Sequence, residues 1–393
     1  MECVQRCIHF IEKSPQMMLG IATALAFQII FSVIWMTGYQ GANERIGGFR
    51  IAIVNEDKIM GVQVLQKLQN SLPFQISNAN QNTARQQLIN REVQMVMTIP
   101  ADFTADLQNP AAQANLLYEI NESNPALVKS VMDSAAVAIT GTVDREASAA
   151  GIQNVLERSS IPSEQASVAA ASLAERVKSE ISYIYSVDGL NNQMVPMMMV
   201  LASFVGAMIM GMNMQQASLT LGNGITKWQA FTARTMINIV SALVISLLGS
   251  SLVMALGGQS AEGFMPLWLF QSLIVWVFLV FSQMFLIVFG IGGMLFNITL
   301  LSLQLVTSGA MIPRQMLGAG FQTTGDLLPA TYAVEGLMNI LFGGVHLGKD
   351  LLGLAVTAII SLVISAAVTA LRKNRHSSRS GESTQHIPTL TSA

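Results

Sequence analysis

Residues 343–350, which read GGVHLGKD, carry the spacing closest to a phosphate-binding motif. A P-loop follows the pattern G-x-x-x-x-G-K-[ST], in which the final hydroxyl holds magnesium. Here Asp350 occupies that last place, where a carboxylate would repel phosphate, and no strand is predicted before the segment. We therefore expect no nucleotide site, and no ATP or magnesium bound by this chain.

The histidines and acidic residues form no recognisable catalytic set. None of the four histidines has metal-ligand spacing to another histidine or to cysteine: His9, His346, His376 and His386. There is no G-x-S-x-G motif for a nucleophilic serine. Glu56 and Asp57 are neighbours at a predicted strand end, where they are expected to cap a turn rather than face each other across a catalytic gap. The sequence thus predicts no metal site and no enzyme.

The composition indicates a membrane protein. The chain has 393 residues, 51% of them hydrophobic and only 11% charged, with a mean hydropathy of +0.49. A soluble domain carries about 25% charged residues. The net charge of −2 argues against a nucleic-acid partner, because such proteins present basic surfaces. We therefore expect an α-helical integral membrane protein with the lipid bilayer as its surroundings.

Six apolar segments are long enough to cross a bilayer, which takes about 20 residues of helix. They are residues 17–39, 194–214, 235–256, 266–289, 291–312 and 351–371. The first is too long for the apolar core of a cleaved signal peptide, about 7–15 residues, so it is expected to remain as an anchor. The fourth and fifth form one charge-free run, in which Gly290, Gly292 and Gly293 mark the expected turn.

Basic residues assign the two sides of the membrane. One side receives Arg6, Lys13, Lys227, Arg234, Arg372, Lys373, Arg375 and Arg379. The short loops of the other side hold only Arg314 and Lys349. Because short cytoplasmic loops are enriched in Lys and Arg, both termini of this multi-pass plasma-membrane protein are expected in the cytoplasm. Residues 1–14 would form a cytoplasmic interfacial helix, and residues 372–393 a disordered cytoplasmic tail.

Residues 43–193 are polar and contain no apolar run of span length. Strands are predicted at 50–55, 74–77, 93–99 and 116–120, alternating with helices at 61–71 and 83–92. Residues 125–179 are Ala-rich and predict two long helices with a break at Pro162. We expect an extracytoplasmic α/β domain with long helices, inserted after the first span.

Prolines interrupt the chain between the fifth and sixth spans, over residues 313–350. Irregular backbone at membrane depth must be packed inside protein or face water. We therefore expect two short helices at the membrane rim, although an ordinary loop between spans has the same pattern. Glu335 lies in this segment. At membrane depth a charged carboxylate costs free energy, so its presence would indicate a function. At the outer rim of the membrane it would be exposed to water and cost little.

Two motifs stand out in this region, small-Gly-x-x-x-Pro and Leu-Pro-x-Thr-Tyr-x-x-acid-Gly-Leu. Their residues are Ser308, Gly309, Pro313 and Leu328, Pro329, Thr331, Tyr332, Glu335, Gly336, Leu337. They resemble the signature of the type-2 ABC transporter permease family, which implies a re-entrant segment. In the preceding domain, a looser pattern is formed by Arg91, Ile99, Pro100, Phe103, Tyr118 and Asn121. It resembles the external domain of a subset, the phage infection protein family.

Residues 215–234 connect the second and third spans on the cytoplasmic side. The resemblance implies a coupling helix here, which would fit a groove in a partner ATPase. The candidate residues are Gly222, Gly224, Lys227, Trp228 and Arg234. The glycines would supply a hinge and the tryptophan an interface anchor. The alternative is that the two basic residues only set orientation and that the tryptophan is an interfacial aromatic.

The function implied by the resemblance is that of the membrane subunit of an ABC exporter. A cytoplasmic ABC ATPase subunit would bind ATP and magnesium, and a second permease would complete a homodimer or heterodimer. The apolar membrane region favours an apolar or amphipathic cargo. The alternative is a cell-surface receptor or secretion-accessory scaffold without a transport cycle, in which the external domain does the work.

Overall fold

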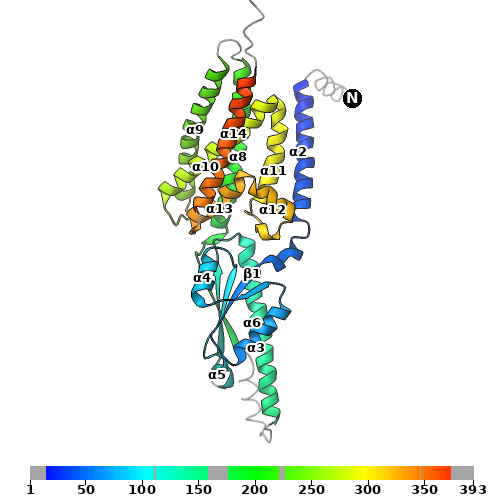
Figure 1. Ribbon diagram of the computed structural model, residues 1–393, viewed down its shortest axis with the longest axis vertical. Coiled ribbons are helices and arrows are strands. Elements are labelled where there is room, and N and C mark those ends of the chain that lie inside the picture. Colours follow the sequence, from blue (N-terminus) through cyan, green and yellow to red (C-terminus); the bar gives the residue numbers. More distant parts are fainter. Residues whose placement is uncertain (1–14, 110–111, 158–175, 221–225, 346, 373–393) are drawn as a thin grey trace, which may run out of the picture.

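The structure is a computed structural model that describes residues 15–109, 112–157, 176–220, 226–345 and 347–372. The interfacial helix expected at residues 1–14 lies outside the described residues, as do Gly222, Gly224 and the tail beyond Arg372. A helix bundle forms one end of the molecule, and a domain built on a β-sheet projects from the other (Figure 1).

Long apolar helices form the bundle. They are α2 (Pro15–Tyr39), α8 (Gly189–Thr220), α9 (Lys227–Ala255), α10 (Phe264–Phe289), α11 (Gly293–Thr307) and α14 (Leu347–Leu371), and each overlaps one expected span. By length and composition, five helical segments of the described chain could cross a membrane: Ala126–Ser148, Gly189–Ser218, Lys227–Ala255, Phe264–Thr307 and Leu347–Leu371. The first belongs to the sheet domain and the fourth joins α10 to α11, so the count of six spans stays a prediction.

The turn between α10 and α11 falls at the expected glycines. Helix α10 ends at Phe289, the 3-10 turn η3 (Gly290–Gly292) follows, and α11 begins at Gly293. The φ angle of Gly290 is +65°, a conformation that a residue with a Cβ adopts only under strain. The break between the two helices thus lies at these glycines.

Helices α8 and α9 are longer than the sequence predicted. The described parts of residues 215–234 belong to these two helices, so no separate coupling helix lies along the membrane there. A capping box fixes the start of α9. The Thr226 hydroxyl accepts the backbone N–H of Gln229 at 3.2 Å, and the Gln229 side chain accepts the N–H of Thr226 at 3.0 Å.

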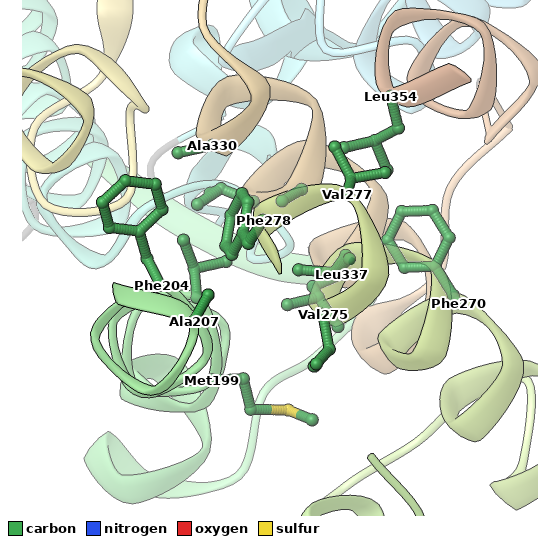
Figure 2. Packing of buried hydrophobic residues seen from close by; sticks show 14 of the residues in the cluster. Met199, Phe204, Ala207, Phe270, Val275, Val277, Phe278, Ala330, Leu337 and Leu354 are labelled. Atoms are coloured by element: carbon green, nitrogen blue, oxygen red, sulfur yellow. The ribbon is translucent and has the colours of Figure 1, made fainter. Parts of the chain in front are cut away.

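Helix α10 runs through the middle of the bundle. Of its 26 residues, 16 are buried, and it packs against α8, α9, α11, α14 and the short helix α13 (Pro329–Phe342). Phe204 of α8 meets Phe278 edge to face, with 5.2 Å between ring centroids. Figure 2 shows this pair in the buried cluster, together with Leu337 and Leu354 from the neighbouring helices.

The outer helices α9 and α14 turn small and polar side chains inward. Those buried are Asn238, Ala242, Ser246, Ser250 and Val253 of α9, and Asp350, Leu354, Ala358, Ser361, Ser365 and Thr369 of α14. Large apolar residues point outward instead: Val244 and Val363 are each 61% exposed. Small residues let helices approach closely in lipid. By its helix composition the chain is a multi-pass membrane protein.

The second region is a five-stranded sheet in the order β2-β1-β3-β4-β5. The strands are β1 (Arg50–Asn55), β2 (Gln75–Asn78), β3 (Met95–Ile99), β4 (Ala114–Asn121) and β5 (Val177–Ile184). Only the β3–β4 pair is antiparallel. In register, Ile53 of β1 lies opposite Met97 of β3, which lies opposite Tyr118 of β4. These three side chains belong to one core.

Helices cover both faces of the sheet (Figure 1). Side chains alternate along β1, so Ile51 and Ile53 join one core while Ala52 and Val54 join another. The first core includes residues of α3 (Met60–Ser71), α5 (Phe103–Gln108) and α6 (Ala126–Glu157). The second includes Ala84 and Leu88 of α4 (Gln81–Ile89). The predicted α/β domain with a long helix is present near the N-terminus.

One element of this domain was predicted wrongly. Residues 177–184 form strand β5, parallel to β4, where the second long helix was expected to end. Only Val177 of this strand is buried. An exposed edge strand therefore lacks the apolar alternation that identifies a strand. Residues 158–175, which include the expected break at Pro162 and most of that expected helix, lie outside the described part of the chain.

Candidate functional site

A cavity of about 340 Å³ lies where the sheet domain meets the bundle. The sheet domain contributes the turn between α4 and β3 and the start of α6. The bundle contributes the end of α11, the signature region and the start of α14. The lining residues are Ile89, Asn90, Arg91, Gln94, Asn124, Pro125, Val128, Ser308, Gly309, Pro313, Arg314, Gln315, Val334, Glu335, Met338, Asn339, Val345, Lys349 and Asp350.

Arg91 is the cationic residue that the sheet domain contributes to this cavity. It has a φ of +60° in the turn after α4. Asn121 supports this turn, because its Nδ2 donates to the Leu88 carbonyl at 2.9 Å and its Oδ1 accepts the Ser123 hydroxyl at 2.7 Å. The same hydroxyl accepts the Nε–H of Arg91 at 3.2 Å. Asn121, at the end of β4, and Ser123 thus hold the Nε end of the Arg91 guanidinium in place.

The far end of the Arg91 side chain carries unsatisfied hydrogen-bonding capacity. Its Nη2 atom is buried without a hydrogen-bond partner among the described residues. Burial lowers the pKa of Arg91, while the charges of Glu335 and Asp350 act in the opposite direction. The guanidinium therefore faces acidic residues of the bundle across the cavity rather than bonding to them.

Glu335 lies between two cations. Its Oε1 is 3.7 Å from Nη1 of Arg314, and its Oε2 is 3.9 Å from Nζ of Lys349. Arg314 also contacts Asp326, with 2.5 Å between Nη2 and Oδ1. The Glu335 side chain is 30% exposed. Glu335 is therefore a half-buried carboxylate at the mouth of the cavity.

Asp350 is the second carboxylate of the cavity, and it is only 1% exposed. Its Oδ2 accepts the Nδ2–H of Asn339 at 3.0 Å. The P-loop pattern of residues 343–350 thus lies at the turn between two helices, α13 and α14, with its last residue buried against α13. This arrangement provides no strand before the loop, which a P-loop requires.

The signature residues build α13 and fix it inside the protein. Leu328 precedes the helix and Pro329 occupies its first turn, where a missing N–H costs nothing. Of the 14 residues of α13, 12 are buried. A Cβ added to Gly336 would overlap the Phe270 ring, so glycine permits the close contact with α10. The Tyr332 hydroxyl donates to the Asp326 carbonyl at 2.7 Å.

The start of the signature joins the bundle to the sheet domain. Gly309 has a φ of +80° and lets the chain turn after α11. Pro313 then leads into the 3-10 turn η4 (Arg314–Met316). The Met316 side chain is fully buried in the core of the sheet domain, and its carbonyl accepts the Nε–H of Arg45 at 2.6 Å.

Three predicted coupling residues lie together at the other end of the bundle. Lys227 donates from Nζ to the carbonyls of Ala370 and Arg372, both at 2.8 Å, and so ties α9 to the end of α14. Arg234 donates to Gln215 of α8 at 2.9 Å. Trp228 is 47% exposed. Lys227 and Arg234 therefore bond within the chain, whereas Trp228 presents its surface outward.

Polar residues inside the bundle divide into two groups. Asn238 and Gln283 form a reciprocal amide pair at 3.0 and 2.9 Å, which joins α9 to α10. Asn297 and Gln304 each make one hydrogen bond, and each keeps a buried atom without a partner among the described residues. The first pair therefore joins two helices of the bundle by hydrogen bonds.

Asp57 caps a turn, as predicted. It accepts the N–H groups of Ile59, Gly61 and Thr104, each at 2.9 Å, and the Thr104 hydroxyl at 2.8 Å. Burial alone would raise the pKa of Asp57, but these hydrogen bonds outweigh it and lower the pKa to about 2. Within the described residues, no three His, Cys, Asp or Glu side chains gather where they could hold a metal ion.

The cavity itself was not predicted. Arg91 was matched only to a family pattern, and Asn339 was not noted. Arg314 and Lys349 were interpreted only as markers of membrane orientation. Basic residues are scarce in the short loops on their side of the membrane, and this scarcity could have drawn attention to the two, because an isolated cation near a membrane needs a partner.

Comparison with known proteins identifies the family. The model of the ABC-2 family transporter proteins matches residues 18–367, which include both the bundle and the sheet domain. The chain is 24% identical to YhgE of Bacillus subtilis (strain 168), an uncharacterised protein, over 176 residues; these make up 44% of this chain and 22% of YhgE.

A solved structure, a domain assigned to an ABC type-2 transporter of Thermotoga maritima, is 13% identical. The matched region makes up 34% of this chain and 86% of that domain's chain. The TM-score of 0.26 is too low to bear on the fold. The family match is therefore the informative one. It covers most of the sequence, and the chain belongs to the ABC-2 family of transporter proteins.

Proposed function

We propose that the chain is the membrane-spanning subunit of an ATP-binding cassette exporter, which works with a separate ATPase subunit. The observation that carries this proposal is the family match through both the bundle and the sheet domain. Members of the ABC-2 permease family are membrane components that normally lack ATPase activity, so the family implies a partner ATPase.

The bundle end opposite the sheet domain is the proposed ATPase contact. Lys227 and Arg372 lie there, on the side that the basic residues assign to the cytoplasm. Exposed Trp228 would insert into the ATPase groove, as an aromatic anchor does at an interface. Lys227 would transmit the movement, because it bonds the start of α9 to the end of α14.

The remaining assignments follow from this arrangement. The sheet domain would lie outside the cell, both termini inside, and a second permease would complete the transporter as a homodimer or heterodimer. An apolar or amphipathic cargo suits the apolar bundle. The partial match to YhgE supports a relationship to that protein, and membership of the phage infection protein subset is our proposal.

Purification in mild detergent tests the proposal, with mass spectrometry of co-purifying proteins and an ATPase assay. We expect a P-loop ATPase to accompany the protein. Trp228→Ala should release it, whereas Trp268→Ala, near the start of α10 at the bundle's other end, should not. An intact protein that repeatedly purifies without any ATPase would favour the receptor or scaffold instead.

A further inference from the structure

Three cations from three parts of the chain meet at the cavity between the two regions. Arg91 comes from the sheet domain, Arg314 from η4 and Lys349 from the first turn of α14. The carboxylates that line the cavity are Glu335 and Asp350. Among the lining residues three cations face two carboxylates, and Asp326, which lies outside the lining, forms an ion pair with Arg314.

The two arginines keep unmet N–H groups, although Nη2 of Arg314 already donates to Asp326 Oδ1 at 2.5 Å and to the Gln322 carbonyl at 2.8 Å. Nη2 of Arg91 and Nε of Arg314 are buried without a hydrogen-bond partner among the described residues. Glu335 does not satisfy its neighbours, because its oxygens are 3.7 and 3.9 Å from the nearest nitrogens, beyond hydrogen-bond length. A buried charged donor without an acceptor is unfavourable. The unmet groups are donors from two separate elements, so the missing partner is an anion.

We propose that this cavity binds a phosphate oxyanion, carried by a singly charged phosphodiester, on Arg91, Arg314 and Lys349. Guanidinium groups match the oxygen geometry of phosphate. The tetrahedral oxygens of a phosphate can reach donors that arrive from three directions, whereas the two oxygens of a carboxylate lie in one plane.

The surroundings suit the same ligand. The volume of about 340 Å³ lies within the range of ligand pockets, about 300–1,000 Å³. Two long helices begin at the cavity wall: Pro125 precedes α6, and Lys349 belongs to the first turn of α14. The amino ends of helices carry partial positive charge and favour phosphate.

The phosphodiester has two sources at this position. The cavity lies at the end of the apolar bundle, where a lipid headgroup can enter, and beside the sheet domain, where a soluble phosphodiester can enter. The chemistry of recognition is the same for both.

The test uses the full chain purified in detergent. Titration calorimetry with inorganic phosphate and with glycerophosphoglycerol measures free anions, and native mass spectrometry with short-chain phosphatidylglycerol measures the headgroup on a lipid. The variants are Arg91→Gln, Arg314→Gln, Lys349→Gln and Glu335→Gln. Arg85→Gln is the matched control, because Arg85 is an exposed arginine of α4 that lies outside this cavity.

We expect saturable binding of at least one probe. Each cation variant should weaken it by about tenfold, the effect of losing one charge-assisted hydrogen bond. Glu335→Gln should tighten it several-fold, because a competing carboxylate is removed, and Arg85→Gln should change nothing. If Arg91→Gln does not fold, Lys349→Gln and Glu335→Gln decide, since Lys349 is 67% exposed.

Three results would overturn the proposal: no saturable binding of any probe, binding that the cation variants leave unchanged, or binding that Glu335→Gln weakens. Binding of phosphatidylglycerol and glycerophosphoglycerol without inorganic phosphate supports a headgroup ligand, and binding of inorganic phosphate supports a free one. The measurement involves no ATPase, so its outcome is independent of the exporter proposal.

Discussion

The sheet domain and the outer helices of the bundle, α9 and α14, bury different kinds of residue. In the sheet domain, Phe103 and Tyr118 are among the largest buried side chains. In the outer helices of the bundle, serine, asparagine and alanine face inward, and residues such as Val244 face outward. Water drives apolar residues inside, whereas in lipid helices associate through close contact and hydrogen bonds. The difference is the one expected of a chain that folds partly in water and partly in lipid.

The junction between these regions has features of both. Met316 of the bundle completes the apolar core of the sheet domain, and Arg91 of the sheet domain faces carboxylates of the bundle. The cavity lies at this junction, between the apolar core of the sheet domain and the helices of the bundle.

Phe103→Ala should destabilise the sheet domain by about 3–5 kcal/mol, because it leaves a cavity in a core built in water. Phe103 is 1% exposed. Urea unfolding of the detergent-solubilised chain, followed by limited proteolysis, measures the change. Val62→Ala is the control, since Val62 is 44% exposed and its loss should matter by less than about 0.5 kcal/mol. Equal effects of the two substitutions would contradict this core.

Val244→Arg should impair membrane insertion by about 2.5–3.5 kcal/mol, the scale for arginine near the centre of a span. Val137→Arg is matched to it, because Val137 of α6 is 63% exposed and Val244 of α9 is 61% exposed. If α6 lies in water, Val137→Arg should be nearly neutral. A glycosylation-reporter insertion assay compares the two. Similar impairment by both would place α6 in the membrane and undo the contrast.

Asp57→Ala should cost the sheet domain about 0.5–2 kcal/mol at neutral pH, because it removes a cap. The pKa of Asp57 is lowered to about 2 from an ordinary value of 3.8. Its contribution is therefore complete above about pH 4 and lost as the pH falls towards 2. Thermal unfolding of wild type and variant between pH 6 and pH 2 measures the difference. A gap that widens at low pH would contradict the assigned hydrogen bonds.

Asn238→Leu should cost the bundle about 0.6 kcal/mol and at most about 1.7 kcal/mol, the range measured for hydrogen bonds between membrane helices. Gln283→Leu should cost a similar amount. The double variant should cost less than the sum, because both amides of the pair are removed. Unfolding in mixed micelles gives the coupling. Strict additivity would show that the pair does not interact.

The elements that the sequence predicted well are those with dense apolar patterns. Strand β1 (RIAIVN) carries four buried apolar residues in a row and was located residue by residue. Glycines indicated the turn between α10 and α11 because glycine readily adopts a positive φ, as Gly290 does. Strand β5 has little apolar character because it forms an edge, so its sequence resembled the helix before it.

The cavity could not be predicted from local pattern. Arg91 and Asp350 are far apart in the sequence and meet only because the sheet domain is seated on the signature region. Glu335 was recognised as a candidate, but both of its neighbours, Arg314 and Lys349, were interpreted only by their position relative to the membrane. Such an arrangement is a property of the tertiary fold.

Labelling of single cysteines in intact cells tests whether the sheet domain and the bundle end that contains Lys227 lie on opposite sides of one membrane. The two native cysteines, Cys3 and Cys7, are first replaced by serine. A membrane-impermeant maleimide should then label Lys178→Cys on the exposed strand β5 directly, and Gln229→Cys at the start of α9 only after permeabilisation. Labelling of both positions in intact cells, or of Gln229→Cys alone, would contradict the account.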